Sequence, residues 1–511
     1  MLIGELLKGT NITGVFRSYR EKDDGLLLSQ LHVTGIATDS SAVCPGDVFV
    51  CIRGSHTDGH LYAGEAVRRG AAAVVAERVM RLGVPMIVTD NTRRTAAFMW
   101  NNRYGDPARN MTLIAVTGTN GKTSVSYMIR EILRCAGYKC GLIGTVKSMA
   151  GERELSFGGG SEITGAAAAM TTPDPRYLYR MLYEMRLAGV THAVMEASSH
   201  ALSQHKLAPL EPSIALFTGL SAEHLDYHGN MENYFSAKSV LFRQARSSII
   251  NFDDPWGKRL CDMLEGGAVK AGTDPDACNV CASEITTSPG EVSYTLRAGG
   301  TSARISCPMP GRFGLYNSLL AASAAMEAGV STDCITDALR HFGGVPGRME
   351  TVARHGKLTV IRDFAHTPEA MRSALEILAG EKIGKLWVVF GCGGDRDRAK
   401  RPEMGRIAAK MADFTVITSD NPRGESRDKI IAEIMGGFDR SKPHRVIPDR
   451  ESAIRYAIAE AADGDTVLLL GKGHENYEIT AEGKRPFDEA AIAASAINER
   501  TDKEKEVKRK D

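Results

Sequence analysis

The stretch that decides the fold is Leu113-Ile114-Ala115-Val116-Thr117-Gly118-Thr119-Asn120-Gly121-Lys122-Thr123-Ser124. An apolar run that enters a glycine turn and leaves on a Lys-Thr pair predicts a buried β-strand, a phosphate-binding loop and the start of a helix. The loop's backbone N–H groups attract phosphate oxygens, Lys122 adds a positive charge, and the Thr123 hydroxyl can ligate Mg²⁺. The usual G-x-x-x-x-G-K-[ST] signature has its first glycine where this chain has Val116. Gly-x-x-Gly-Lys-Thr after an apolar strand still indicates a nucleotide site.

Length and charge limit the possible classes of protein. The 511 residues are too many for one hydrophobic core, and the usual domain size predicts about three domains, which we place at residues 1–108, 109–345 and 346–511. The 63 Lys and Arg residues nearly balance the 62 Asp and Glu residues, so no overall field attracts nucleic acid or an anionic membrane. Neither a membrane-length apolar run nor a signal-like segment is present. We therefore expect a cytoplasmic protein without membrane insertion.

Short apolar segments alternate with helical stretches in residues 1–108. Predicted strands at 47–50, 72–75 and 86–88 indicate an α/β module, which has no phosphate loop. Segments 38–40 and 53–59 are rich in hydroxyl residues and glycine. Such segments suit a binding surface for a polar ligand or an ordinary surface turn, and the residues alone leave both interpretations open.

The central part carries a carboxylate in a position that suits chemistry. A predicted strand at 193–196 ends in Glu196, and ligands of parallel α/β sheets gather at the carboxyl ends of strands. Glu196 therefore either supplies a hard oxygen ligand to Mg²⁺ beside the phosphate loop or caps the helix that follows. A β-rich segment is predicted farther along, at 278–307.

Two further features lie between that carboxylate and the β-rich segment. A predicted strand at 214–218 opens into the polar segment 223–229, which could bring a second metal ligand. Lys238 follows on a predicted amphipathic helix. Periodicity alone makes Lys238 an ordinary solvent-exposed lysine.

Residues 346–511 predict a third unit with a doubly wound, mostly parallel sheet. Apolar strands are expected at 358–361, 387–390, 414–417 and 467–470. A polar loop follows each strand, and these loops begin at Asp363, Gly391, Ser419 and Gly471. Because the carboxyl ends of parallel strands meet at one edge of a sheet, we expect the loops to form one site.

Motifs along nearly the whole chain resemble those of the Mur ligases. In chain order they are GTNGKTS, TTPDP, MEASSHAL, HLDYHGNMENYFSAKSVLF, GRFGLYN, GVPGRME, DFAHTP, GCGGDRDRAKRP, SDNPR and GKGHENYE. The resemblance implies an α/β fold of three domains. These are an N-terminal domain that binds a UDP-linked substrate, a central P-loop ATPase-like domain with a β-rich insertion, and a C-terminal Rossmann-like domain that binds the incoming amino acid.

The resemblance also implies a reaction. ATP activates the terminal D-Glu carboxylate of UDP-MurNAc-L-Ala-D-Glu as an acyl phosphate, an incoming amine attacks it, and phosphate leaves. Lys122 and Mg²⁺ held by Thr123, Glu196 and His224 would neutralise charge that gathers in the transition state. By the same resemblance Lys238 is carbamylated, which turns a cation into an anionic oxygen ligand for Mg²⁺. We expect a monomer.

The resemblance assigns residues to four sets. The catalytic set is Lys122, Glu196, His224 and Lys238. The ATP set is Gly118, Thr119, Asn120, Gly121, Lys122, Thr123, Ser124, Asn317, Arg348, Asp363 and His366. The UDP-substrate set is Thr38, Ser40, Ser55, His56, Thr57, Thr171, Thr172, Ser198, Gln204 and Lys206. The amino-acid set is Arg396, Asp420, Asn421, Pro422, Arg423, Gly471 and Glu475.

Arg423 points to the third substrate. Members of the family that add meso-2,6-diaminopimelate have this arginine and those that add L-lysine replace it, because a guanidinium can grip the second carboxylate in a bidentate pair. Glu475 would take the distant ammonium. The alternatives are an L-lysine-adding relative, a ligase similar to folylpolyglutamate synthetase, and a nucleotide-binding switch without catalysis.

Three residues depart from the usual family pattern. Ser41 and Lys206 stand where arginine is common, and Phe364 stands where tyrosine is frequent. Lysine keeps the charge of arginine but loses its bidentate geometry. None of the three belongs to the catalytic set.

Overall fold

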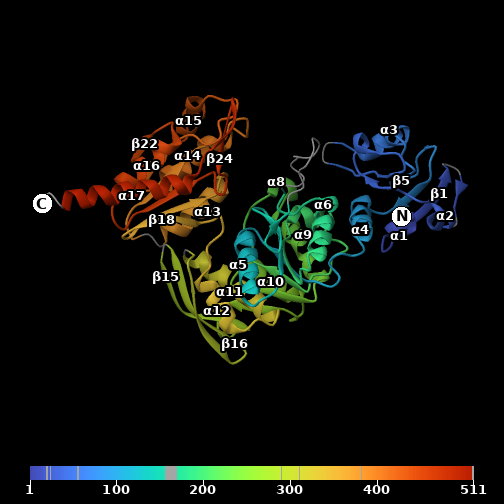
Figure 1. Ribbon diagram of the computed structural model, residues 1–511, viewed down its shortest axis with the longest axis horizontal. Helices are drawn as coiled ribbons and strands as arrows, with labels where there is room; N and C mark the ends of the chain where they lie inside the picture. The colour runs from blue at the N-terminus through green and yellow to red at the C-terminus, as the bar shows by residue number, and fades with distance from the viewer. Residues whose placement is uncertain are drawn as a thin grey trace. The chain divides into compact units, whose positions relative to one another are not determined.

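The computed structural model of the chain describes residues 1–18, 21–23, 25–54, 57–155, 170–288, 290–309, 311–380 and 383–508. The chain forms two compact units. The first comprises Met1–Lys122, Gly137–Ile250 and Asp254–Ala268, and the second comprises Thr123–Ala136, Asn251–Asp253 and Val269–Asp511. Figure 1 labels many of the helices and strands of both units, which are mixed α/β structures.

The N-terminal part of the first unit is a sheet flanked by helices. Its elements are α1 (Ile3–Leu6), β1 (Ile12–Ser18), β2 (Glu21–Lys22), α2 (Leu26–Gln30), β3 (Ile36–Ala37), η1 (Ser40–Ala42), β4 (Val48–Val50), η2 (Gly59–Tyr62), α3 (Ala63–Arg68), β5 (Ala73–Ala76), β6 (Met86–Thr89) and α4 (Thr92–Arg103). The strand order is β2-β1-β6-β5-β4-β3, and β3 to β6 pair in parallel. Phe49 and Val74 of the sheet pack in one buried cluster with Ala66 of α3. The α/β module predicted here is confirmed.

The rest of the first unit carries a second sheet. Its elements are β7 (Thr112–Thr117), β8 (Cys140–Ile143), β9 (Ser148–Ala150), β10 (Arg153–Glu154), α6 (Pro175–Leu187), β11 (His192–Glu196), α7 (Ser199–Ser203), β12 (Ile214–Phe217), α8 (Leu225–His228), α9 (Met231–Gln244), β13 (Ser247–Asn251) and α10 (Pro255–Met263). Strands β8, β11, β7, β12 and β13 lie in that order and pair in parallel. They are nearly continuous buried runs, as parallel strands covered on both faces are. The carboxyl ends of β11, β7 and β12 therefore meet at one edge.

The second unit begins with helices and a meander. Its first elements are α5 (Lys122–Cys135), β14 (Val269–Gly272), β15 (Val280–Ser288), β16 (Glu291–Ala298), β17 (Thr301–Cys307), α11 (Gly311–Glu327) and α12 (Thr332–Arg340). Strands β15, β16 and β17 pair antiparallel, which confirms the β-rich segment. Alternate residues of β16, Val292, Tyr294 and Leu296, are fully buried, so one face of the meander belongs to the core.

The C-terminal part of the second unit is a doubly wound sheet. Its elements are β18 (Glu350–His355), β19 (Leu358–Asp363), α13 (Pro368–Ala379), β20 (Leu386–Phe390), α14 (Lys400–Met411), β21 (Phe414–Ile417), α15 (Arg427–Met435), β22 (His444–Val446), α16 (Arg450–Glu460), β23 (Thr466–Leu470), β24 (Tyr477–Thr480), β25 (Gly483–Pro486) and α17 (Glu489–Lys508). The strand order is β18-β19-β23-β20-β21-β22. Strands β19, β23, β20 and β21 pair in parallel. The loops after these strands therefore share one edge, as predicted.

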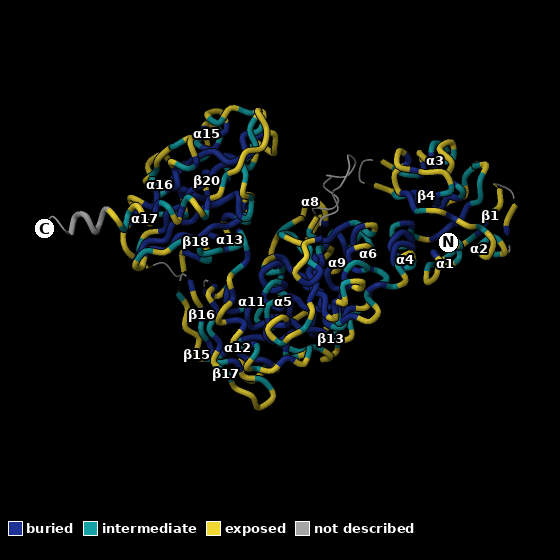
Figure 2. Tube along the Cα trace, in the orientation of Figure 1, coloured by how far each residue is buried: buried dark blue, intermediate teal, exposed yellow. Residues whose placement is uncertain are grey.

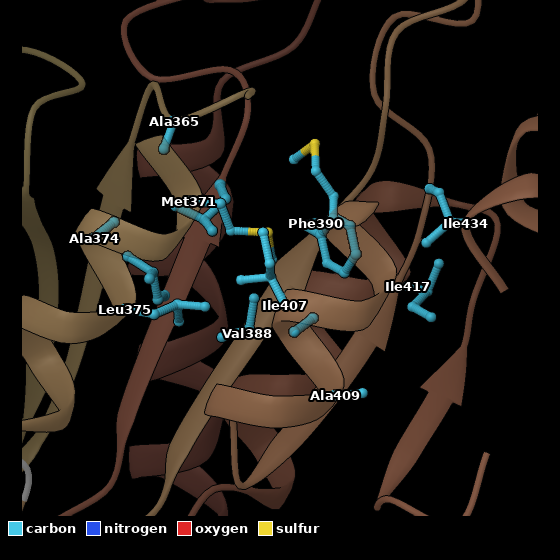
Figure 3. Packing of buried hydrophobic residues seen from close by; sticks show 14 of the residues in the cluster. Ala365, Met371, Ala374, Leu375, Val388, Phe390, Ile407, Ala409, Ile417 and Ile434 are labelled. Atoms are coloured by element: carbon cyan, nitrogen blue, oxygen red, sulfur yellow. The ribbon is translucent and has the colours of Figure 1, made fainter. Parts of the chain in front are cut away.

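Both faces of this sheet are buried. In β20, Val388 and Phe390 point into a cluster with α13, α14 and α15, while Trp387 and Val389 point into a cluster with α16 and α17. Figure 3 shows the first cluster, and Figure 2 shows β20 in the buried interior. Alternation of side chains along the strand explains why every residue of β20 is apolar.

Truncating Leu375, a fully buried residue of the first cluster (Figure 3), should destabilise this part of the protein. We expect Leu375→Ala to lower the free energy of unfolding by about 2–5 kcal/mol, because lost transfer free energy and a cavity both contribute. Hydrogen exchange of amides in α13 and β20 measures the change. The neighbouring Glu376 is exposed, so Glu376→Ala should change the same amides by less than about 0.5 kcal/mol. Equal effects of the two substitutions would contradict the packing described.

None of the helices in the described ranges combines the length and the apolar character needed to cross a membrane.

Candidate active site

The phosphate loop joins β7 to α5, which confirms the predicted strand, loop and helix. Gly118 has a φ of +148°, and a Cβ at this position would collide with Oγ1 of Thr218, so only glycine fits. The Thr119 N–H donates to the Gly219 carbonyl at 2.9 Å and fastens the loop beside the end of β12. The Lys122 ammonium donates to the carbonyls of Gly118 and Thr119 at 3.1 and 2.8 Å. The loop therefore holds a cation at the position where the sequence predicts phosphate binding.

Glu196 is fully buried at the carboxyl end of β11, opposite Val116 of β7. Its two oxygens accept hydrogen bonds from the backbone N–H and the hydroxyl of Thr145, each at 2.9 Å. A Cβ on Gly144 would collide with Oε1 of Glu196, so the glycine leaves room for the carboxylate. Helix α7 is capped by the Ser198 hydroxyl. The interpretation of Glu196 as a helix cap is therefore wrong.

Hydroxyl side chains of the predicted UDP-substrate set gather around Glu196. The Thr172 hydroxyl donates to the Glu196 carbonyl at 2.8 Å and accepts from the Ser198 N–H at 2.9 Å. The hydroxyls of Thr171 and Thr145 lie 3.0 Å apart. The structure thus brings together predicted residues from separate segments of the chain.

Gln204 and Lys206 of the same set follow α7. The Gln204 side-chain amide lies 3.4 Å from the Tyr227 hydroxyl. Lys206 is 5% exposed, and its ammonium pairs with the Asp174 carboxylate at 2.8 Å. A buried lysine held by one carboxylate can contribute positive charge without the paired N–H groups of an arginine.

Lys238 lies on α9 and is only 1% exposed. The helix is confirmed, but the prediction from periodicity that this lysine faces solvent is wrong. Its ammonium donates to the Gly118 carbonyl at 2.7 Å and lies 4.7 Å from the centroid of the Tyr234 ring. Burial lowers the pKa of Lys238 well below its ordinary value, and the charge of Lys122 lowers it further. Its amine is therefore more readily neutral, which is the form that reacts with electrophiles.

His224 stands at the start of α8 with a φ of +56°, in the left-handed region that side chains rarely adopt. Its ring centroid lies 4.9 Å from that of His200 and 6.3 Å from that of Tyr234. Tyr234 in turn shares a hydrogen bond of 3.2 Å with the Thr119 hydroxyl of the phosphate loop. Backbone strain of this kind tends to be retained where a side chain has a functional position.

These residues can be tested for their fit to Mg²⁺. In the part of the chain that the structure describes, no three His, Cys, Asp or Glu side chains gather to hold a metal ion by themselves. Mg²⁺ usually keeps several waters and takes one or two carboxylates together with substrate phosphates. The buried Glu196 carboxylate, set in the space left by Gly144 beside the phosphate loop, fits such an ion. Thr123 and His224 stay predicted ligands.

The predicted nucleotide residues of the first domain lie in loops of its own sheet. Ser40 is buried and donates to a glutamate carboxylate on α3 at 3.1 Å. Thr38 is exposed just before it, and the Thr57 carbonyl accepts from the Gly54 N–H at 2.8 Å. Ser55 and His56 fall outside the described residues. The binding role of this group stays a prediction.

Asn317, Arg348, Asp363 and His366 all belong to the second unit. Both Asp363 oxygens accept backbone N–H groups at 2.8 Å; burial raises the pKa of Asp363, and the nearby Arg348 opposes that rise. The Phe364 ring lies 5.2 Å from the Arg348 guanidinium and 4.7 Å from the His366 ring. Within the described residues, Nδ2 of Asn317 and Nε of Arg348 are buried without hydrogen-bond partners. Unpaired buried donors suit a ligand rich in acceptors.

The predicted amino-acid set meets at the carboxyl edge of the C-terminal sheet. A Cβ on Gly393 would lie 2.8 Å from Nη1 of Arg423 and 3.7 Å from Cγ of Arg396, so both arginines border the same loop. A Cβ on Gly471 would lie 2.7 Å from Oδ2 of Asp420. The loops after β20, β21 and β23 are therefore neighbours, as predicted.

Glu475 joins this set through an amide. Nδ2 of Asn421 donates to Oε2 of Glu475 at 2.8 Å. Arg423, which has a φ of +49°, donates from Nη1 to the Gly394 carbonyl at 2.9 Å. A guanidinium and a carboxylate thus stand in the same group of loops, as a zwitterionic ligand requires.

Sequence reasoning missed several residues of these sites. Thr145 contacts Glu196 from a turn that belongs to none of the motifs. Tyr234 contacts Lys238 and the phosphate loop and lies within the HLDYHGNMENYFSAKSVLF motif, but it is not among the predicted site residues. Lys472 and His474 lie within the quoted GKGHENYE motif, yet they received no role. His474 has a buried Nδ1 without a hydrogen-bond partner among the described residues, and its ring lies 5.3 Å from that of Phe364.

Comparison with known families gives matches along most of the chain. The family model described as Mur ligase family, catalytic domain, matches residues 32–99. The model described as Mur ligase middle domain matches residues 116–325. The model described as Mur ligase, glutamate ligase domain, matches residues 347–473.

Individual relatives are similar over nearly their full length. A UDP-N-acetylmuramoyl-L-alanyl-D-glutamate--2,6-diaminopimelate ligase from Geobacillus thermodenitrificans is 40% identical over 478 residues, covering 92% of this chain and 95% of its own. The protein of the same name from Syntrophomonas wolfei is 39% identical, with 97% and 99% covered. A solved structure of a ligase of this name has a TM-score of 0.66 at 30% identity and covers 92% of this chain and 95% of its own.

Proposed function

The chain belongs to the Mur ligase family, and we propose that it joins meso-2,6-diaminopimelate to the D-glutamate carboxyl of UDP-N-acetylmuramoyl-L-alanyl-D-glutamate at the expense of ATP. Relatives at 39 to 40% identity over nearly the whole chain carry the name of this reaction. The reaction builds an amide in a precursor of peptidoglycan.

The first step makes the substrate carboxylate reactive. A carboxylate is a poor electrophile, and it is repelled by the polyphosphate of ATP. Lys122 and the backbone N–H groups of the phosphate loop stabilise the charge on the γ-phosphate, so that a carboxylate oxygen can attack phosphorus and release ADP. The amine of the amino acid then attacks the acyl phosphate, and the tetrahedral intermediate collapses with loss of phosphate.

Thr123, Glu196, His224 and a carbamylated Lys238 would hold Mg²⁺, which would supply positive charge to offset the negative charge of the substrates. The carbamate forms when the neutral Lys238 amine attacks CO₂ and the product loses a proton. Burial favours the neutral amine, as the lowered pKa of Lys238 indicates.

The observation that carries the proposal is the position of Lys238 and Glu196 around the phosphate loop. Lys238 is buried against the Gly118 carbonyl at 2.7 Å, and Glu196 ends the strand next to β7. A simple nucleotide-binding switch requires the loop but neither of these residues. A ligase that activates a carboxylate requires all three parts.

The C-terminal domain supplies selectivity for the amino acid. Arg423 and Arg396 would hold carboxylates of the diamino diacid, and Glu475 would hold its distant ammonium. We propose that the active form is a monomer. A cytoplasmic location fits a reaction that consumes ATP.

The test is phosphate release by the purified protein with ATP and UDP-MurNAc-L-Ala-D-Glu. We expect release with meso-2,6-diaminopimelate and little with L-lysine or without an amino acid. Release with L-lysine alone would assign the chain to the lysine-adding relatives, and absence of release with either amino acid would contradict the proposed substrates.

Arg423→Ala should raise the KM for meso-2,6-diaminopimelate about 100-fold, because a charged substrate group loses its partner. The KM for ATP should stay within about twofold, since this loop is assigned to the amino acid. Initial-rate kinetics with each substrate varied in turn measure both values. The exposed Arg440 of the same domain supplies the control Arg440→Ala. Equal losses for ATP and the amino acid would refute the assignment of Arg423.

A further inference from the structure

Lys472 is a fully buried lysine at the end of β23. Its ammonium donates to Oδ1 of Asn421 at 2.9 Å and to the Tyr477 carbonyl at 2.9 Å, and it lies 3.5 Å from Oδ1 of Asp420. Burial lowers the pKa of Lys472, and the carboxylate of Asp420 opposes that change. A lysine is rarely fully buried unless its charge and its donors are used. Here they are used by the loops of the amino-acid site.

The partners of Asn421 determine which way its amide faces. Oδ1 accepts from the Lys472 ammonium and also from the Ile479 N–H at 2.9 Å. Both partners are donors without any acceptor. The oxygen of Asn421 must therefore face them, and its NH₂ group must face Oε2 of Glu475, to which it donates at 2.8 Å. The orientation of the amide follows from its surroundings, not from a choice of atom names.

This arrangement has an electrostatic consequence for Glu475. A neutral amide holds the carboxylate in place without cancelling its charge, whereas a direct pair with Lys472 would cancel it. The contact with Asn421 therefore leaves the Glu475 carboxylate available to an ammonium group of a ligand. Lys472 is linked to Glu475 by hydrogen bonds through the side chain of Asn421. The two charges also interact through space, since Glu475 is among the groups that raise the pKa of Lys472.

Contacts with the β24–β25 hairpin also fix the backbone of Arg423. The Arg423 N–H donates to the Ile479 carbonyl at 3.0 Å, so the loop pairs with the β24–β25 hairpin. Lys472 donates to the carbonyl of Tyr477, the first residue of β24, and so holds the start of the hairpin. The buried Glu478 anchors the hairpin to Arg427 at 3.0 Å. The spacing between the guanidinium and the carboxylate of the site thus depends on this hairpin.

We propose that Lys472 is a positioning residue for amino-acid selection, which orients the Asn421 amide and thereby holds Glu475 at the distance from Arg423 that a diamino diacid requires. The inference rests on the proposed function and deepens it. Asn421 then has two roles. It connects Lys472 to Glu475 by hydrogen bonds, and it is a predicted member of the amino-acid set.

The first experiment is steady-state kinetics of Lys472→Met, which keeps the length of the side chain but removes all its donors. We expect the KM for meso-2,6-diaminopimelate to rise about tenfold, the scale of a lost hydrogen bond to a charged group. The kcat at saturation and the KM values for ATP and the UDP-linked substrate should change less than about threefold. Lys442 is exposed in the same domain, and Lys442→Met is the matched control. A fall in kcat with unchanged KM would overturn the proposal.

A double-mutant cycle separates positioning from a merely structural role. If Lys472 acts through Glu475, adding Lys472→Met to Glu475→Gln should raise the KM no further than Glu475→Gln alone, within about twofold. Multiplied effects of the two substitutions would show that Lys472 stabilises the domain without directing Glu475.

A second variant tests the role of the amide even if Lys472→Met does not fold. Asn421→Asp keeps the size of the side chain but replaces the NH₂ donor with an oxygen that faces Glu475. It should raise the KM for the diamino acid as Lys472→Met does, while an unchanged KM would contradict the role of the amide. Wild-type phosphate release that requires all three substrates is the reference. If that release is missing the proposed function fails, whereas an additive cycle in an active enzyme refutes only the role of Lys472.

Discussion

Lys238→Ala should reduce the rate of ligation by about 1000-fold or more, the scale of losing an electrostatic group aimed at the transition state. Lys238 is buried against the phosphate loop, and as a carbamate it would supply an anionic oxygen ligand for Mg²⁺. The measurement is phosphate release with saturating substrates. The exposed Lys258 on α10 gives the control Lys258→Ala, which should retain the wild-type rate.

Two further results would separate a carbamate from a cation at this position. Lys238→Arg keeps positive charge but cannot form the carbamate, so it should be as inactive as the alanine variant. Small carboxylates such as formate or acetate should restore part of the activity of Lys238→Ala, because they can place an oxygen anion in the space left by the side chain. An active arginine variant would contradict the carbamate.

The dependence on CO₂ follows from the same chemistry. Wild-type protein kept in carbonate-free buffer should lose activity and regain it when bicarbonate is added. The intact mass should increase by one CO₂ in the active form. The buried amine reacts because burial lowers its pKa and leaves more of it neutral at a given pH. Activity that is independent of bicarbonate, with no change of mass, would contradict the modification.

Lys122→Met should reduce phosphate release by about 1000-fold, since one charged donor to the transferring phosphoryl group is lost. The Lys122 ammonium donates to the carbonyls of Gly118 and Thr119, so contacts with the backbone hold it at the loop. We expect the loss mainly in kcat, because the phosphoryl group gains its charge contacts in the transition state. Single-turnover phosphate release measures a loss in the reaction rate, and calorimetry measures a loss in ATP affinity.

The control for Lys122→Met is a lysine outside the site. Lys139 is exposed at the start of β8, and Lys139→Met should leave phosphate release unchanged. A Lys122→Met variant that binds ATP far more weakly but reacts at the normal rate when saturated would contradict a role in the transition state.

Local patterns in the sequence predicted the frame of these sites. An apolar run before Gly118 is enough to predict β7, the loop and α5, because strand, turn and helix each follow from short-range preferences. The apolar segments of the C-terminal part predicted parallel strands whose loops share one edge. The positions of Glu196 and Arg423 at such edges follow from the same rule.

What the sequence could not show depends on tertiary packing. The burial of Lys238 arises because α9 packs against the phosphate loop. The helical periodicity of the neighbouring residues does not predict this burial. Thr145 holds Glu196 from a turn without a motif. The direction of the Asn421 amide is set by Lys472 and Ile479, more than 50 residues away. Contacts at such separations cannot be read from local preferences.

Gly118 has a consequence for inhibition. Its φ of +148° and the Thr218 hydroxyl beside it exclude every side chain larger than hydrogen. An inhibitor anchored by an anionic group on the backbone N–H groups of this loop would contact atoms that every residue type carries. A single mutation therefore has little room to weaken that anchor without also disabling the enzyme, so drug resistance would have to arise at contacts elsewhere on the inhibitor.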